Sequence, residues 1–146
     1  MTLLTVEIAA AGYGAVTVLR DVVFEIPEGG RLVVLGANGA GKTTTLRTIS
    51  GLCRLEGAVR FAGKDITGMP PHRVAATGIA HMPQGRGTFG DLTVRENLLV
   101  GGSGRPGRAA ARDAARWLDP FPRLAERSGR PASGLSGGVQ QLRAIA

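Results

Sequence analysis

The chain has 146 residues, a formal net charge of +7 and 43% hydrophobic residues. This length and composition indicate one globular domain with a core and exclude an intrinsically disordered chain. No run of 18 apolar residues predicts a membrane-spanning helix, and the first residues lack the basic flank of a secretory signal. Cys53 is the only cysteine, so no intrachain disulfide can form, and we expect a cytoplasmic protein.

The first 51 residues predict strands followed by a loop and a helix. Residues 3–8 and 21–26 have strand composition, and the glycines between them favour an antiparallel pair. A turn at 27–30 precedes the apolar run 32–35, which is typical of a short strand buried on both faces. That strand leads into a Gly-rich loop and a helix over 42–50, which Gly51 ends.

The middle of the chain alternates short strands with a helix. We expect a strand at 59–62, a helix from Pro70 and Pro71 to about Gly78, and a buried strand at 79–82. Strands that alternate with helices around a buried apolar strand indicate an α/β fold.

A helical section is predicted over about 86–140. Thr93 is a good N-cap for a helix that ends at Val100, and Glu96 completes a capping box. Residues 109–118 form a strong helix, in which Trp117 is expected to be core, and 120–130 hold one further short helix at most.

Residues 36–43 read GANGAGKT and fit the pattern G-x-x-x-x-G-K-[ST]. Glycines let the loop backbone turn its N–H groups toward a phosphate, and the following helix adds its positive N-terminus. Lys42 would reach the β- and γ-phosphates, and Thr43 would offer a hydroxyl to Mg²⁺. The alternative is a chance match, which average residue usage puts at about one in a hundred. The pattern therefore predicts nucleotide binding.

Residues 135–141 read LSGGVQQ, and Ser136 begins a predicted helix that runs to the last residue. A hydroxyl and bare glycine N–H groups at a helix start make a second anion site. The alternative is a flexible loop before a surface helix. Two phosphate sites about a hundred residues apart either fold together or share nucleotides between subunits.

These motifs resemble the nucleotide-binding domain of ABC transporters, and more narrowly the ATP-binding subunits of branched-chain amino acid uptake systems. The residues that carry the resemblance are 11–30, 36–52, 83–102 and 135–141. The resemblance implies a P-loop NTPase core with an N-terminal antiparallel β subdomain and an inserted helical subdomain. It places the β subdomain and core at 1–85, the helical subdomain at 86–140 and the start of the signature helix at 136–146.

The resemblance also implies roles for single residues. Tyr13 would stack on adenine, and Gln84 would contact Mg²⁺ or the attacking water in catalysis; the alternatives are a strand-turn tyrosine and an ordinary loop glutamine. Thr43 and Gln84 would be the metal contacts. The implied nucleotide-binding residues are Tyr13, Gly36, Asn38, Gly39, Ala40, Gly41, Lys42, Thr43 and Thr44. The implied contacts to the ATP of a second subunit are Leu135, Ser136, Gly137, Gly138 and Gln140.

In the family, the signature helix is followed by the Walker B strand, which ends in Asp-Glu, and by a switch histidine. These would lie beyond Ala146, so we expect a chain truncated before the Walker B strand that binds ATP weakly and is deficient in hydrolysis. The implied partners are a second ATP-binding subunit in a head-to-tail dimer, transmembrane permease subunits at the inner face of the plasma membrane and, further upstream, a solute-binding protein. The implied cofactors are ATP and Mg²⁺.

Two other readings stay open. One is an ABC ATPase without a transport role. A membrane subunit that purifies with the intact protein would argue against it. The other is a non-catalytic basic binding module, which salt-sensitive nucleic-acid binding without ATP would support. The arginines 105, 108, 112 and 116 share one helical face, which is either solvated or a docking surface for an acidic partner or lipid head groups. The basic residues are otherwise scattered, so we expect no nucleic acid partner.

Overall fold

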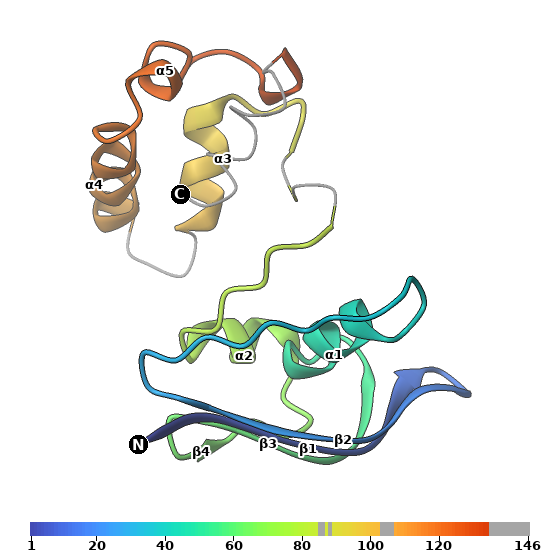
Figure 1. Ribbon diagram of the computed structural model, residues 1–146. Helices are drawn as coiled ribbons and strands as arrows, with labels where there is room; N and C mark the ends of the chain where they lie inside the picture. Colours follow the sequence, from blue (N-terminus) through green and yellow to red (C-terminus); the bar gives the residue numbers. More distant parts are fainter. Residues whose placement is uncertain (85–86, 88, 103–106, 135–146) are drawn as a thin grey trace. The chain divides into compact units, whose positions relative to one another are not determined.

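The computed structural model describes residues 1–84, 87, 89–102 and 107–134 (Figure 1). The chain divides into two compact units, Met1–His81 and Met82–Ala146, and each is described by itself. Among the helices of the described residues, none has both the length and the apolar character that crossing a bilayer requires.

The first unit is built on a four-stranded sheet. Its strands are β1 (Thr2–Tyr13), β2 (Val16–Pro27), β3 (Arg54–Phe61) and β4 (Lys64–Asp65). They lie in the order β2-β1-β3-β4, and every neighbouring pair is antiparallel. The predicted hairpin is confirmed, but its strands are longer than 3–8 and 21–26, because β1 forms hydrogen bonds with a strand on each side over most of its length.

Two helices lie on the same side of this sheet, α1 (Lys42–Ile49) and α2 (Pro71–Ala76) (Figure 1). Alternate residues of the strands point toward them, as a strand with one buried face requires. Ile49 and Val74 bring the helices into the core. The buried core residues are Val6, Ile8, Ala11, Leu19, Ile49, Val59, Ile66 and Val74. Both predicted helices of this unit are confirmed.

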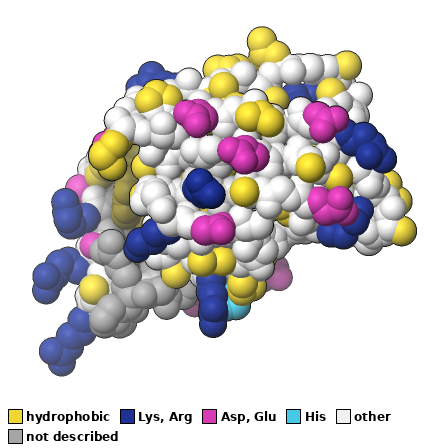
Figure 2. Space-filling model, turned by 90° about the horizontal axis from the view of Figure 1, so that it is seen from below, with side chains coloured by type: hydrophobic (Ala, Val, Ile, Leu, Met, Phe, Trp, Pro, Cys, Tyr) yellow, Lys and Arg dark blue, Asp and Glu magenta, His cyan; other side chains and the backbone are white. Residues whose placement is uncertain are grey.

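The other face of the sheet carries charges of both signs (Figure 2). Glu7, Glu56 and Arg60 are exposed, and they alternate along their strands with the residues that face the core. A mixed, solvated face of this kind keeps the outside of an antiparallel sheet in water while its inner face stays apolar.

Two predicted strands are not formed. Residues 32–35 lie outside any strand, and Val33 and Leu35 are 75% and 85% exposed. Residues 79–82 likewise form no strand. A strand buried on both faces needs hydrogen-bonded neighbours, and the described residues provide no neighbouring strand for either run, although Ile79 packs against the core. The strand expected at 59–62 begins earlier, at Arg54, because β1 offers a pairing edge that far.

The second unit is helical. It contains α3 (Val94–Gly101), α4 (Gly107–Leu118), α5 (Pro122–Ala125) and the 3₁₀ turn Ala132–Gly134. Its core joins Val94, Leu98, Ala114 and Leu124. Trp117 is 44% exposed, contrary to the expectation: it continues the stripe of Ala110 and Ala114 at helical spacing, but it lies in the last turn of α4, beyond the buried part of that stripe.

The capping box at the start of α3 is confirmed. The Thr93 Oγ1 accepts a hydrogen bond from the Glu96 N–H at 3.2 Å, and a Glu96 carboxylate oxygen accepts one from the Thr93 N–H at 2.7 Å. These bonds, the one from the Thr93 backbone first, lower the pKa of Glu96 from its ordinary value of 4.5. A lowered pKa means that the charged carboxylate stabilises the folded state.

This contribution should depend on pH. Because the folded-state pKa is lowered, the stabilisation is complete above the unfolded pKa and is lost as pH falls through the folded pKa. We expect Glu96→Gln to lower the melting temperature at pH 7 and to have little effect at pH 3. The fluorescence of Trp117, the only tryptophan, reports the unfolding of this unit. Glu126→Gln in the same unit is the charge-matched control, and an equal effect of Glu96→Gln at both pH values would contradict the prediction.

Candidate functional site

The Gly-rich loop, residues 36–41, turns tightly just before α1. Its glycines 39 and 41 have φ angles of +86° and +91°, in the left-handed region that favours glycine. The Ala40 N–H donates to the Ala37 carbonyl at 3.2 Å and makes a tight turn. A Cβ at Gly41 would come within 2.5 Å of the side chain of Leu19, so the end of the loop packs closely against β2.

The loop ends directly at the N-terminus of α1. Gly41 is the N-cap, no side chain caps the helix, and no acidic residue lies in its first turn. The first N–H groups of α1 therefore have no side-chain acceptor, and with the helix dipole they favour an anion. Thr43 is exposed, whereas Thr44 is buried, and buried Thr45 donates its hydroxyl hydrogen to the Gly41 carbonyl at 3.1 Å.

Lys42 reaches back over the loop. Its Nζ donates to the carbonyl oxygens of Gly36 and Ala37, both at 2.7 Å. The ammonium group thus binds two consecutive carbonyls at the start of the loop and connects them to the first residue of α1. Phosphate oxygens are stronger acceptors for an ammonium group than neutral carbonyls. Backbone donors, a cation and the exposed Thr43 hydroxyl together fit a polyphosphate with Mg²⁺.

Tyr13 lies at the end of β1 and is 39% exposed. Its hydroxyl oxygen accepts a hydrogen bond from Nη1 of Arg47 at 3.3 Å, and Cζ of Arg47 lies over the ring, 6.0 Å from its centroid. The hydrogen bond to Tyr13 raises the pKa of Arg47. An aromatic ring with exposed surface thus lies beside the helix that begins at the Gly-rich loop.

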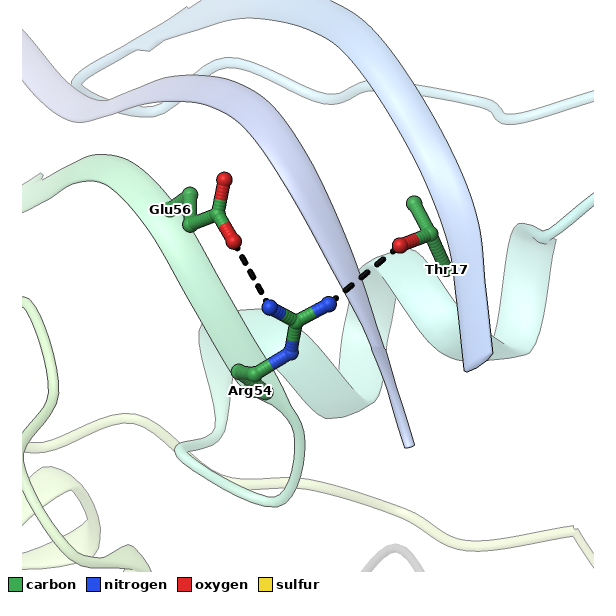
Figure 3. Close-up of polar contacts among 3 residues, drawn as sticks. All are labelled: Thr17, Arg54 and Glu56. Carbon is green, nitrogen blue, oxygen red and sulfur yellow. Dashed lines mark hydrogen bonds and ion pairs between the residues drawn. The ribbon is translucent and has the colours of Figure 1, made fainter. Parts of the chain in front are cut away.

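A second arginine reaches from β3 toward β2 (Figure 3). Arg54 of β3 forms an ion pair with Glu56 at 2.7 Å and donates to the hydroxyl oxygen of Thr17 on β2 at 3.2 Å. Gly12 of β1 pairs with both Arg54 and Thr17, and a Cβ at Gly12 would collide with the Val16 carbonyl, so the backbones of β1 and β2 approach too closely here for a side chain. An exposed ion pair of this kind contributes at most about 1 kcal/mol to stability.

The first unit therefore brings together Tyr13, the loop with Gly36, Asn38, Gly39, Ala40 and Gly41, and the α1 residues Lys42, Thr43 and Thr44. Gln84 is exposed at the start of the second unit. Leu135, Ser136, Gly137, Gly138 and Gln140 lie outside the described residues, as does Arg105. Sequence reasoning missed Arg47, and no local pattern could have found it, because its partner Tyr13 is 34 positions away.

The chain matches known proteins over most of its length. The family model described as "ABC transporter" matches residues 19–146. The chain is 39% identical over 134 residues to the high-affinity branched-chain amino acid transport ATP-binding protein BraG of Pseudomonas aeruginosa, covering 91% of this chain and 58% of that protein. It is 38% identical over 137 residues to the probable branched-chain amino acid transport ATP-binding protein LivF of Archaeoglobus fulgidus, covering 93% and 58%. The chain thus spans 58% of the length of these two relatives.

Solved structures of similar proteins agree with this match. A nucleotide-free ATP-binding cassette from an ABC transporter has a TM-score of 0.80 and 29% identity, covering 99% of this chain and 65% of that one. The ADP conformation of MJ1267, another ATP-binding cassette of an ABC transporter, has a TM-score of 0.79 and 28% identity, covering 99% and 63%. The matched fold includes the antiparallel sheet, the loop and the helices described above. With the family model matching from β2 to the last residue, this chain belongs to the ABC transporter family.

Proposed function

We propose that the chain binds Mg·ATP and serves as the ATP-binding subunit of a transporter. The observation that carries the proposal is the position of Lys42. Its ammonium group binds the carbonyls of the Gly-rich loop at the start of a helix that no side chain caps. A cation and convergent N–H donors at one point favour several negative charges on neighbouring phosphates.

Each residue of the site has a proposed role. The backbone of Gly36, Asn38, Gly39, Ala40 and Gly41 surrounds the phosphates, and Lys42 binds the β- and γ-phosphates. The hydroxyl of Thr43 contacts Mg²⁺, and the N–H of Thr44 completes the helix start. Tyr13 stacks on the adenine ring, and Gln84 contacts the metal or the attacking water. Bound Mg²⁺ neutralises charge on the phosphates, which is the chemistry that the metal supplies.

The relatives support a role in transport. BraG and LivF are described as branched-chain amino acid transport ATP-binding proteins. By this likeness we propose that the whole protein couples ATP binding and hydrolysis to uptake of branched-chain amino acids. It would pair with a second ATP-binding subunit through Ser136, Gly137 and Gly138 and dock on permease subunits at the inner face of the membrane. The division into a β subdomain with the core, 1–85, and a helical subdomain, 86–140, belongs to this proposal.

Titration with Mg·ATP and with Mg·AMP tests the binding. AMP has the adenine and ribose but lacks the β- and γ-phosphates that Lys42 would bind. We expect Mg·ATP to bind at least about tenfold more tightly, because one hydrogen bond to a charged group contributes about 1.5–3 kcal/mol. Equal affinity for the two nucleotides would contradict a phosphate site at the loop.

A further inference from the structure

The ring of Tyr13 and the Gly-rich loop are connected through one short piece of β2. Gly41 lies against Leu19, and three residues earlier on the same strand Val16 pairs with Tyr13. At the rise of an extended strand, these three residues correspond to about 10 Å. The ribose and the α-phosphate of a nucleotide bridge a span of this size. A nucleotide with its terminal phosphates at Lys42 would therefore bring its base to Tyr13.

Arg47 contacts the Tyr13 ring in two ways, through a hydrogen bond and a cation–ring contact. It comes from α1, five residues after Lys42, so one rigid helix carries both the phosphate-binding cation and the group that contacts the ring. Its guanidinium group holds the Tyr13 hydroxyl at 3.3 Å and lies over the ring at 6.0 Å from the centroid. The hydrogen bond limits rotation of the ring, and the cation adds a contact with it. Tyr13 is still 39% exposed, which leaves surface for a flat ligand.

We propose that Arg47 is a positioning residue for the nucleobase, which fixes the Tyr13 ring so that the exposed surface of the ring stacks on the base. The inference rests on the proposed binding of ATP. A ring that is already fixed loses less conformational freedom when the base binds, so Arg47 raises affinity without touching the phosphates. The guanidinium group itself touches the ring, and its effect on the nucleotide passes through Tyr13.

The test compares ligands with and without a base, Mg·ATP and Mg·tripolyphosphate. We expect Arg47→Met to weaken Mg·ATP binding by about two- to fivefold, the size of an exposed cation–aromatic contact. Binding of Mg·tripolyphosphate should not change, so the ratio of the Mg·ATP affinity to the Mg·tripolyphosphate affinity should fall by the same factor. Arg47→Lys keeps a charged donor and should recover part of the ratio. Arg73→Met, an exposed arginine of α2, is the matched control for the lost charge and should leave the ratio unchanged.

A double substitution separates positioning from a general effect on the helix. In the Tyr13→Leu background, Arg47→Met should produce no further change in the ratio. An unchanged ratio in Arg47→Met, or an effect that persists without Tyr13, overturns the inference. If the methionine variant does not fold, Arg47→Lys provides the comparison, with a smaller fall in the ratio that should also disappear in the Tyr13→Leu background. Failure of the unsubstituted chain to bind either ligand would instead contradict the proposed function, and the inference with it.

Discussion

Replacing Lys42 by methionine is expected to weaken Mg·ATP binding by about ten- to a hundredfold. Methionine keeps the length of the side chain but removes the charge and the three donors of the ammonium group. A hydrogen bond to a charged group contributes about 1.5–3 kcal/mol, and that range sets the size of the effect. Lys42 also donates hydrogen bonds to the carbonyls of Gly36 and Ala37, so the substitution removes these two bonds within the loop as well. Isothermal titration calorimetry measures the affinity.

The chain offers a matched control for this substitution. Lys64 is the only other lysine, and it is exposed in β4 on the sheet's edge. Lys64→Met changes the net charge by the same amount and should leave Mg·ATP binding within about twofold, because salt screens an exposed distant charge. If both variants weaken binding equally, the effect of Lys42 comes from net charge, and the account of the loop is wrong.

Replacing Gly57 by alanine is expected to destabilise the first unit by about 3–5 kcal/mol. Gly57 lies in the middle of β3 with a φ of +136°, which side chains with a Cβ rarely adopt. It faces the irregular stretch of β1 between Ile8 and Ala10, and a new Cβ would collide with the backbone carbonyl of Glu7. Backbone strain and a clash with backbone in the central strand pair belong among the largest single-residue effects. Urea unfolding followed by circular dichroism measures the change.

Gly63→Ala separates strain from crowding. Gly63 also has a positive φ, +75°, but a Cβ there would meet nothing within 4 Å. The cost should be about 1–2 kcal/mol, that of a left-handed residue alone. Equal costs at Gly57 and Gly63 would show that close approach of β1 and β3 contributes nothing, which would contradict the strand register described here.

Local signals predicted the local structure well. The spacing of Thr93 and Glu96 predicted a capping box, and both of its hydrogen bonds are present. Pro70 and Pro71 predicted the start of α2, and the GKT sequence predicted the start of α1. In each case the residues that determine the structure are within a few positions of one another, so the pattern is readable from the chain alone.

Features that depend on distant residues were predicted less well. The apolar run 32–35 has the composition of a buried strand, but burial requires neighbouring strands, which the described residues do not supply. The pairing of β1 with β3 and the contact between Arg47 and Tyr13 join residues far apart in sequence. Trp117 was predicted to be core from its apolar position on the helix, but it lies in the last turn of α4 and is 44% exposed. Composition cannot resolve such choices, because the packing partner determines them.

The central claim is that residues 36–44 bind the phosphates of a nucleotide, and amide chemical shifts test it most directly. We predict that adding Mg·ATP to the ¹⁵N-labelled chain produces its largest shifts at the amides of Gly39, Gly41, Lys42, Thr43 and Thr44, because these N–H groups lie in the loop and at the start of α1. Mg·tripolyphosphate should shift the same amides. Saturable binding with its largest shifts elsewhere, or no shifts in a folded chain, would contradict the account.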